Sequence, residues 1–276
     1  MIILQSIIQE SVIFISLWPP RTLFIPMEST NGTSVVVPED MNQIYDIPAW
    51  LAILLTIIYL SVSLCAIIGN WMVLWIVIRS SSMRNVTNLF IANLASSDII
   101  IGAFAIPFQF QAALLQKWLL PHFMCSFCPT VQVISLNLSI FTLIALSLDR
   151  HRAITQPLKK RMSKRCGIII IVFIWLVSII TAIPTYVAFK IIWQETSQRN
   201  DSQRNLMPIC APYGLEENFL LMYNHVLVCL QYVFPIIIIS MAYIHMAIVL
   251  SRGPGIRNEV RSESDRVIQS KKRVSR

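Results

Sequence analysis

The sequence predicts an all-α membrane protein, a polytopic bundle of five membrane-spanning helices. Of the 276 residues, 55% are hydrophobic and 13% are charged, whereas a soluble domain carries about 25% charged residues. The apolar residues form five long runs separated by polar segments. Each run is long enough for a helix that crosses about 30 Å of hydrocarbon. A soluble protein could not bury this much apolar surface, so we expect the protein to lie in a bilayer.

The five runs define a predicted transmembrane domain over residues 48–252. We expect its spans at about 51–78, 89–115, 123–148, 166–189 and 219–250. Pro107 predicts a kink in the second span, because proline lacks the N–H that a helical turn needs. The third run is followed directly by charged residues, so we expect that helix to leave the bilayer after Leu148.

Two terminal segments lie outside this domain. The N-terminal segment, residues 1–47, opens with an apolar run that is too interrupted to span a bilayer and lacks the basic start of a signal peptide. We therefore expect residues 1–26 to lie outside the folded unit. Asn31 and Asn200 each begin a sequon and are candidate glycosylation sites. The C-terminal segment, residues 253–276, is basic and rich in serine.

Basic residues predict how the chain is oriented. The segments that follow the first, third and fifth runs are basic, whereas the segments on the other side are close to neutral or acidic. Because cytoplasmic segments are enriched in Lys and Arg, we expect the N-terminus outside the cell and the C-terminus in the cytoplasm. The formal net charge of +8 therefore describes the loops and does not indicate nucleic-acid binding.

Asp98 is the one Asp, Glu, Lys or Arg residue within the predicted spans. A carboxylate at membrane depth costs at least about 2.5 kcal/mol, so Asp98 should face the bundle interior. Asn70 and Ser139 lie at depths where they can partner it. Oxygen ligands suit a hard cation, so Na⁺ among these three residues is one interpretation. The alternative is a protonated Asp98 that joins helices through hydrogen bonds.

Three of the six cysteines, Cys125, Cys128 and Cys210, lie near loops. A bridge from Cys210 would hold the polar loop of residues 190–218 over the bundle. Cys125 begins the third span and Cys128 lies one helical turn further in. Both remain candidate partners of Cys210, and Cys125 is favoured.

Polar residues near the span ends suggest two further sites. Asp149 and Arg150 can pair with each other or with another helix and act as a switch, although position alone favours a membrane-interface anchor. In the outer halves, amides and aromatic rings can bind a peptide backbone or an amidated peptide end, or join helices through hydrogen bonds. These outer residues are Phe108, Gln109, Trp118 and Gln132.

Enzymes and transporters fit the sequence poorly. No catalytic constellation, metal cluster or phosphate loop stands out in the sequence. A transporter or channel would predict internal repeats or several intramembrane charges, and the sequence shows neither.

An ordered series of motifs resembles the rhodopsin-like (class A) G-protein-coupled receptors. These motifs are Gly69-Asn70, N-L-A-S-S-D at Asn93–Asp98, Cys125, S-L-D-R-H at Ser147–His151, Trp175, Pro235 and Tyr243. A closer resemblance is to the invertebrate kinin (leucokinin or myokinin) neuropeptide receptors. It is carried by R-N-V-T-N-L-F-I-A-N-L-A (Arg84–Ala95), I-P-F-Q-F-Q-A-A-L-L-Q-K-W (Ile106–Trp118), F-M-C-S-F-C-P (Phe123–Pro129) and F-T-L-I-A-L-S-L-D-R-H-R-A-I (Phe141–Ile154).

The resemblance implies a neuropeptide-gated receptor in the plasma membrane. Its implied partners are an extracellular amidated neuropeptide, a heterotrimeric G protein and membrane lipid, and the implied cofactors are none except Na⁺ at Asp98. The implied sites are a disulfide between Cys125 and Cys210, a sodium and activation site at Asp98, Ser139 and Asn70, a coupling switch at Asp149, Arg150 and Tyr243, and a ligand pocket that includes Gln109 and Gln132. His151 replaces a commoner tyrosine, as it also does in the kinin receptors.

The sequence differs from this family in the number of membrane spans. Such receptors have seven, and this sequence has five. The resemblance therefore implies a receptor truncated after the fifth helix. We expect such a chain not to signal alone, because outward movement of the sixth helix opens the G-protein cavity. The alternative is a truncated isoform that dimerises with a full-length receptor and regulates it.

Overall fold

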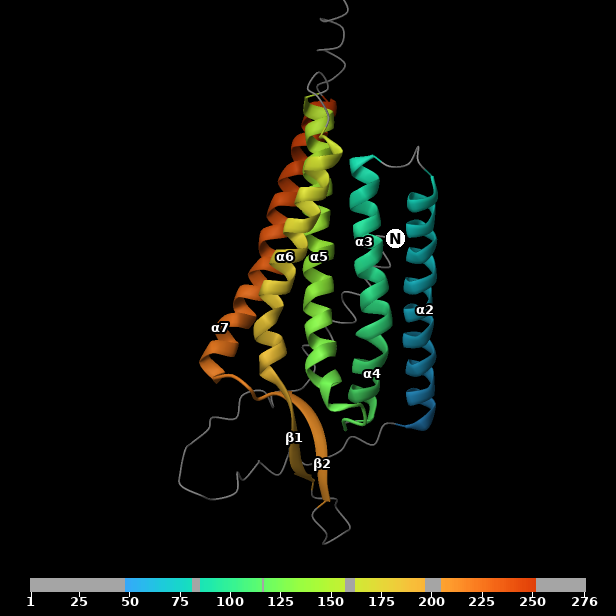
Figure 1. Ribbon diagram of the computed structural model, residues 1–276, viewed down its shortest axis with the longest axis vertical. Helices are drawn as coiled ribbons and strands as arrows, with labels where there is room; N and C mark the ends of the chain where they lie inside the picture. Colours follow the sequence, from blue (N-terminus) through green and yellow to red (C-terminus); the bar gives the residue numbers. More distant parts are fainter. Residues whose placement is uncertain (1–47, 81–84, 116, 157–161, 197–204, 252–276) are drawn as a thin grey trace, which may run out of the picture.

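The computed structural model describes residues 48–80, 85–115, 117–156, 162–196 and 205–251. Within them, five helices are long and apolar enough to cross a membrane, which confirms the predicted fold class. The helices run roughly side by side along the long axis of the molecule (Figure 1). The predictions for residues 1–47 and 253–276, and for Asn31 and Asn200, lie outside the described residues.

The element bounds follow the predicted spans closely. The elements are α2 (Ala49–Arg79), α3 (Val86–Phe104), α4 (Ile106–Leu115), α5 (His122–Thr155), α6 (Lys164–Ala188), β1 (Phe189–Thr196), β2 (Asn205–Pro212), α7 (Glu217–Val228) and the π-helix η3 (Cys229–Val233). Together α3 and α4 form the second span, Val86–Leu115. The fifth span, Glu217–Ser251, includes α7 and η3 and continues as α-helix to its end.

Two prolines account for the irregular turns of the second and fifth spans. Pro107 lies in the first turn of α4, where its missing N–H is tolerated, and the helix breaks just before it at Ala105. In the fifth span, the N–H of Phe234 bonds to the carbonyl of Cys229, one residue before Pro235. This wider π-turn fits a position where proline interrupts the regular ladder of hydrogen bonds.

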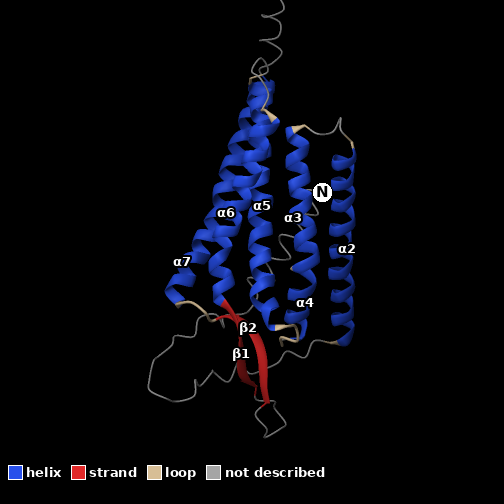
Figure 2. Ribbon diagram, viewed as in Figure 1, coloured by secondary structure: helices blue, strands red, loops and turns tan. Residues whose placement is uncertain are grey.

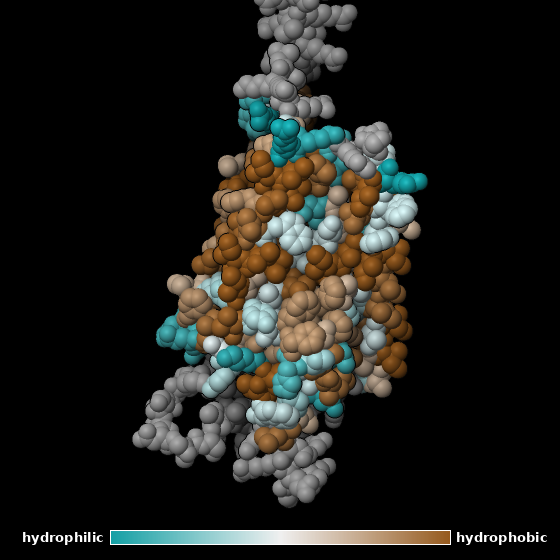
Figure 3. Space-filling view, viewed as in Figure 1, coloured by the Kyte–Doolittle hydropathy of each residue, from teal (hydrophilic) through white to brown (hydrophobic). Residues whose placement is uncertain are grey.

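The α3 and α5 helices form the interior of the bundle. In the second and third spans, 56% of the apolar segment is buried, against 11% in α2. The core joins α2, α3, α4 and α5 through Ala66, Ile101, Ala105, Ile106 and Leu136. Apolar side chains cover most of the face of the bundle seen in Figure 3, and hydrophilic residues gather toward its two ends. A bilayer is the solvent that matches this surface.

A β-hairpin covers one end of the bundle (Figure 2). The strands β1 and β2 pair antiparallel, with Phe189 opposite Pro212 and Ile191 opposite Cys210. The sequence analysis treated this region as a polar loop, and that description was wrong. β1 follows α6 without a break, and its apolar residues Ile191, Ile192 and Trp193 belong to the segment that was predicted to be a polar loop.

The other end of the bundle, which we call the basic end, carries mainly positive charge. Its described charged residues are Arg79, Asp149, Arg150, Arg152, Lys164 and Arg165. Here α5 continues to Thr155, seven residues beyond the predicted exit at Leu148. Hydropathy locates the membrane boundary and not the helix end, because charged residues are good helix formers in water. The helix stops at Gln156, the residue before a proline, where helical backbone is disfavoured.

Candidate functional site

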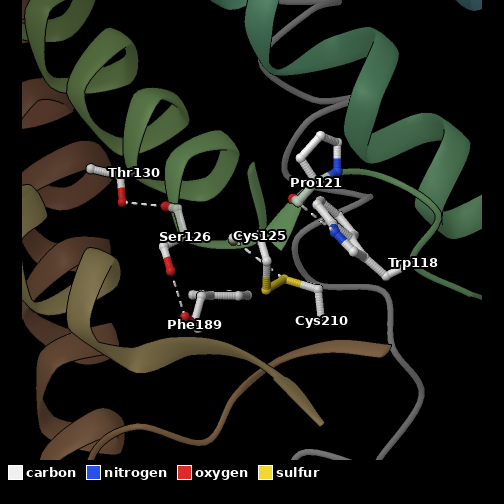
Figure 4. The surroundings of a disulfide bond; sticks show 7 residues. All are labelled: Trp118, Pro121, Cys125, Ser126, Thr130, Phe189 and Cys210. Atoms are coloured by element: carbon white, nitrogen blue, oxygen red, sulfur yellow. Dashed lines mark hydrogen bonds between the residues drawn. A yellow bond between two sulfur atoms is a disulfide. The ribbon is translucent and has the colours of Figure 1, made fainter. Parts of the chain in front are cut away.

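A disulfide ties the hairpin to the start of α5 (Figure 4). It joins Cys125 of α5 to Cys210 of β2, whose Cα atoms lie 5.6 Å apart. Cys128, the competing candidate, is buried and free. The structure therefore confirms Cys125 as the partner and fixes the middle of β2 above the bundle.

Backbone contacts reinforce this anchor. The Trp118 N–H donates to the Pro208 carbonyl of β2 over 2.7 Å, and the Ser126 hydroxyl of α5 donates to the Phe189 carbonyl of β1 over 2.7 Å. The Trp118 side chain is 6% exposed, and its indole N–H donates to the Pro121 carbonyl over 3.4 Å. Trp118, which the sequence placed in a ligand pocket, thus holds the hairpin to the turn before α5.

The other predicted pocket residues lie in the hairpin half of the bundle. Phe108 and Gln109 are half-buried on α4, and Gln132 is buried on α5. Phe110 of α4 stacks on Tyr59 of α2, with ring centroids 4.3 Å apart, and this contact orients α4. The described amides and aromatic rings therefore come from two neighbouring spans beneath the hairpin.

Asp98 lies in the bundle interior with Asn70 and Ser139, the two residues proposed as its partners. Asp98 of α3, Asn70 of α2 and Ser139 of α5 are all buried. The Asp98 carboxyl is hydrogen-bonded by the side chains of Ser139 and Asn70, and the Ser139 hydroxyl lies 2.6 Å from that of Ser97. Three helices thus bring oxygen-bearing side chains together around one carboxyl group.

Ser135 adds a further oxygen, which the sequence analysis did not single out. It lies one turn before Ser139 on α5, and its buried hydroxyl is without a hydrogen-bond partner among the described residues. Carboxylate, amide and hydroxyl oxygens are a donor set that fits a hard cation. A serine four residues before Ser139 in a mostly apolar run is the sequence signal that could have identified Ser135.

Asp149 and Arg150 were predicted to pair with each other or with another helix, and in the described part of the chain Asp149 bonds to another helix and not to Arg150. The Asp149 carboxylate accepts a hydrogen bond from Thr87 of α3 over 3.0 Å, and Arg150 is exposed at the basic end. Successive helical residues point about 100° apart, so Asp149 faces α3 while Arg150 faces away from it. Tyr243, which the sequence grouped with them, is 58% exposed on the fifth span.

A polar relay joins α3, α5 and α6 in the bundle interior. The Asn93 amide donates to the Thr142 hydroxyl over 2.7 Å, and the Trp175 indole donates to the Asn93 carbonyl oxygen over 2.9 Å. The sequence analysis used Asn93 and Trp175 as motif residues and did not predict that they meet. Satisfying these groups inside the bundle fixes how the three helices are rotated.

A second relay joins α5 to α6 and to the π-turn of the fifth span. The Asn137 amide donates to the Thr181 hydroxyl over 2.8 Å, and the Gln231 amide donates to the Asn137 carbonyl oxygen over 3.0 Å. Nearer the hairpin, the hydroxyls of Thr185 and Tyr223 lie 2.7 Å apart. These contacts hold the fifth span to the rest of the bundle.

Comparison with known proteins shows which family the chain belongs to. Residues 69–276 match the family described as 7 transmembrane receptor (rhodopsin family). Among similar curated proteins is the tachykinin-like peptides receptor 99D of Drosophila melanogaster, 32% identical over 74% of this chain and 39% of that receptor. The neuropeptide Y receptor type 2 of Gallus gallus is 34% identical over 75% of this chain and 54% of that receptor.

The RYamide receptor of Tribolium castaneum is also 34% identical, over 70% of this chain and 53% of that receptor. The chain thus spans about half the length of the curated relatives it matches. The family match covers more than half of the chain.

Proposed function

Because the chain belongs to the rhodopsin family of seven-transmembrane receptors, we propose that it functions as a neuropeptide receptor. It is a multi-pass membrane protein, and its relatives are receptors rather than enzymes. A peptide binds at the hairpin end, and a heterotrimeric G protein binds at the basic end. The similar proteins support this proposal, since they are receptors for tachykinin-like peptides, neuropeptide Y and RYamide.

The main support for a peptide site is the position of the hairpin, which is held over the end of the bundle where α4 and α5 present their amide side chains. The disulfide between Cys125 and Cys210 fixes the hairpin in place, and Gln109 and Gln132 lie beneath it. A side-chain amide offers both donors and an acceptor, which match a peptide backbone or an amidated C-terminus. We take an amidated, kinin-like peptide as the ligand, on the strength of the kinin-receptor stretches in the sequence.

The charge distribution supports a plasma-membrane orientation with the basic end in the cytoplasm. Five of the six described charged residues there are basic, and Asp149 is the exception. Because cytoplasmic segments are enriched in Lys and Arg, this end faces the G protein and the hairpin faces outward. The exposed Arg150 and Tyr243 are then available to a cytoplasmic partner, while Asp149 remains bonded to Thr87.

For the Asp98 cluster we propose a sodium site. Asp98, Asn70 and Ser139 would hold the ion, and the Ser135 hydroxyl, which has no hydrogen-bond partner among the described residues, lies one helical turn before Ser139. The bound charge would replace a proton as the partner of the buried carboxylate. In the test, thermal melting of the purified chain is compared in NaCl and in choline chloride. We expect Na⁺ to raise the melting temperature of wild type and not of Asp98→Asn, and equal melting of wild type in both salts would rule out the site.

Calcium release tests the peptide assignment. The full coding sequence that contains these residues is expressed in cells, and amidated kinin-like peptides are compared with their free-acid forms. We expect release with the amidated peptides, and at least a tenfold loss of potency in Gln132→Leu. Gln156→Leu, at the basic end of α5, is the matched control and should leave peptide potency unchanged. A receptor present at the cell surface that answers no such peptide would remove the ligand assignment.

The regulatory alternative, in which this chain pairs with a full-length receptor, remains a prediction from sequence. Co-expression of the two chains separates it from the first proposal. Retention of the longer receptor inside the cell would support it, and unchanged surface levels would count against it.

A further inference from the structure

Two histidines meet at the basic end. His151 Nε2 of α5 lies 2.9 Å from His245 Nδ1 of the fifth span, within hydrogen-bond distance. Their ring centroids are 4.9 Å apart and the ring planes are inclined at 49°. In Figure 1 the red end of the fifth span runs beside the yellow-green end of α5 at this point. The contact joins residues 94 positions apart in the sequence.

We propose that His151 and His245 form a proton-sensitive clasp between α5 and the fifth span. In a hydrogen bond between two imidazole rings, one nitrogen must carry the proton and the other must accept it. The pair keeps this bond with no extra proton or with one. A second extra proton places N–H groups on both facing nitrogens, so the bond is replaced by repulsion between two cations.

Histidine is the side chain that ordinarily changes charge between pH 5 and 8, so this chemistry operates within a physiological range. The surroundings of the pair accentuate the effect. The titratable and charged groups described at this end are Asp149, Arg150 and Arg152 of α5, Lys164, Arg165 and Cys166 of α6, Arg79 of α2, and Tyr243 of the fifth span. The carboxylate of Asp149 is bonded to Thr87 of α3. Doubly protonated histidines would therefore meet mostly like charge.

The clasp matters because few described side-chain hydrogen bonds hold the fifth span to its neighbours. Tyr223 bonds to Thr185 near the hairpin and Gln231 bonds to Asn137 in the middle, whereas His245 bonds to His151 at the basic end. Of these three contacts, the histidine pair is the one that joins two imidazole rings, and imidazole is the side chain that ordinarily changes charge between pH 5 and 8. Loss of the histidine contact frees the basic end of the span while the other two contacts keep the rest in place. This inference does not depend on any ligand, so it stands apart from the proposed peptide.

A double-mutant cycle tests the clasp in the full chain, purified in lipid nanodiscs with EDTA present. The melting temperature is measured at pH 7.5 and at pH 5.5 for wild type, His151→Gln, His245→Gln and the double variant. Glutamine keeps hydrogen-bonding capacity and does not titrate. His225→Gln is the matched control, because His225 is exposed on α7 and bonds to the Leu221 carbonyl of its own helix.

We expect a favourable coupling between the two positions at pH 7.5 that is lost at pH 5.5. His225→Gln should retain the pH response of wild type. Equal coupling at both pH values would overturn the proposal. Absence of coupling at pH 7.5 with EDTA present would do the same, because it would mean that no proton-mediated bond joins the rings.

A distance measurement keeps the proposal testable if a glutamine variant fails to fold. Spin labels are placed at Gln156→Cys and Ser251→Cys, both exposed at the basic end, with Cys65, Cys166 and Cys229 replaced by serine. We expect the separation of the labels to lengthen or broaden between pH 7.5 and pH 5.5. An unchanged distribution would overturn the clasp, as would a pH-dependent one that persists in His151→Tyr.

Discussion

The two ends of the bundle are held together by different kinds of contact. At the hairpin end, a disulfide between Cys125 and Cys210 acts together with the Trp118 and Ser126 hydrogen bonds to the strands. At the basic end, single side-chain hydrogen bonds join the helices, from Thr87 to Asp149 and between His151 and His245. One end is covalently fixed, and the other is held by contacts that cost little to exchange.

The different contacts at the two ends indicate where the molecule can change shape. A covalent bond and backbone hydrogen bonds give the hairpin end one arrangement, which suits a surface that must present fixed groups. Contacts of about 0.5–3 kcal/mol each, as at the basic end, can be replaced by those of a partner.

Removing the disulfide should have the largest effect. Cys210→Ser opens a link between residues 85 positions apart and should lower stability by about 2–5 kcal/mol, because the unfolded chain gains conformational freedom. Thermal melting in detergent, with and without reductant, measures the change. Cys166→Ser removes an exposed free thiol and is the control. If Cys210→Ser has the same melting temperature as wild type, the disulfide does not stabilise the hairpin end.

A methyl group at Gly167 should have the next largest effect. Its Cβ would lie 2.8 Å from Val86 Cγ1, where the start of α6 packs on α3, so Gly167→Ala should cost about 1–3 kcal/mol. Gly69→Ala meets nothing within 4 Å and should be neutral, or stabilising by up to about 1 kcal/mol. Val86→Ala should partly rescue Gly167→Ala. Equal melting temperatures for the two glycine variants would contradict the close contact.

Removing the Thr87 hydroxyl should loosen α3 from α5 at the basic end. Thr87→Val keeps the side-chain shape and leaves the Asp149 carboxylate without its donor, so we expect a loss of about 1–2 kcal/mol. Thr155→Val is the control, because the Thr155 hydroxyl bonds to the His151 carbonyl within its own helix. Melting curves for both variants measure the change. If Thr155→Val loses more stability than Thr87→Val, the contact between α3 and α5 does not stabilise the basic end more than a hydrogen bond within α5.

Removing one hydrogen bond at the hairpin end should have the smallest effect. Ser126→Ala leaves the disulfide and the Trp118 contact in place, so we expect a loss of at most about 1 kcal/mol. Thr130→Ala, which loses a bond to its own helix at the Ser126 carbonyl, is the matched control. If Ser126→Ala destabilises the chain as much as Cys210→Ser, the hairpin end is not held redundantly. The contrast between the two ends would then fail.

Much of the fold and part of the candidate site could be predicted from individual residues. Five runs of apolar side chains placed the spans, because burial in hydrocarbon is a local property of composition. Asp98 could be assigned to the interior, with Asn70 and Ser139 as partners, since a carboxylate in lipid is costly. Position favoured Cys125 over Cys128 as the partner of Cys210, the motif resemblance implied the same pairing, and the structure confirms it.

The remaining features depended on how the helices are rotated and where segments meet. The end of α5 lay beyond Leu148, the loop after α6 was a hairpin, and Asp149 bonded to Thr87 rather than to Arg150. Hydropathy does not distinguish a helix from a strand in a short apolar segment, so it could not predict the hairpin. It also does not give the rotation of a helix or the point where a helix ends outside the membrane.

Local sequence was enough to locate five runs long and apolar enough to cross a membrane, to show that the segments at the two ends of these runs differ in charge, and to indicate which family the motifs resemble. Each of those properties depends on the composition or order of residues that are close together in the sequence. The tertiary structure alone decided that His151 meets His245, and that Gln231 and Thr181 meet Asn137. Such contacts link distant parts of the chain. They depend on the rotation and depth of whole helices, which are set by packing all the spans together.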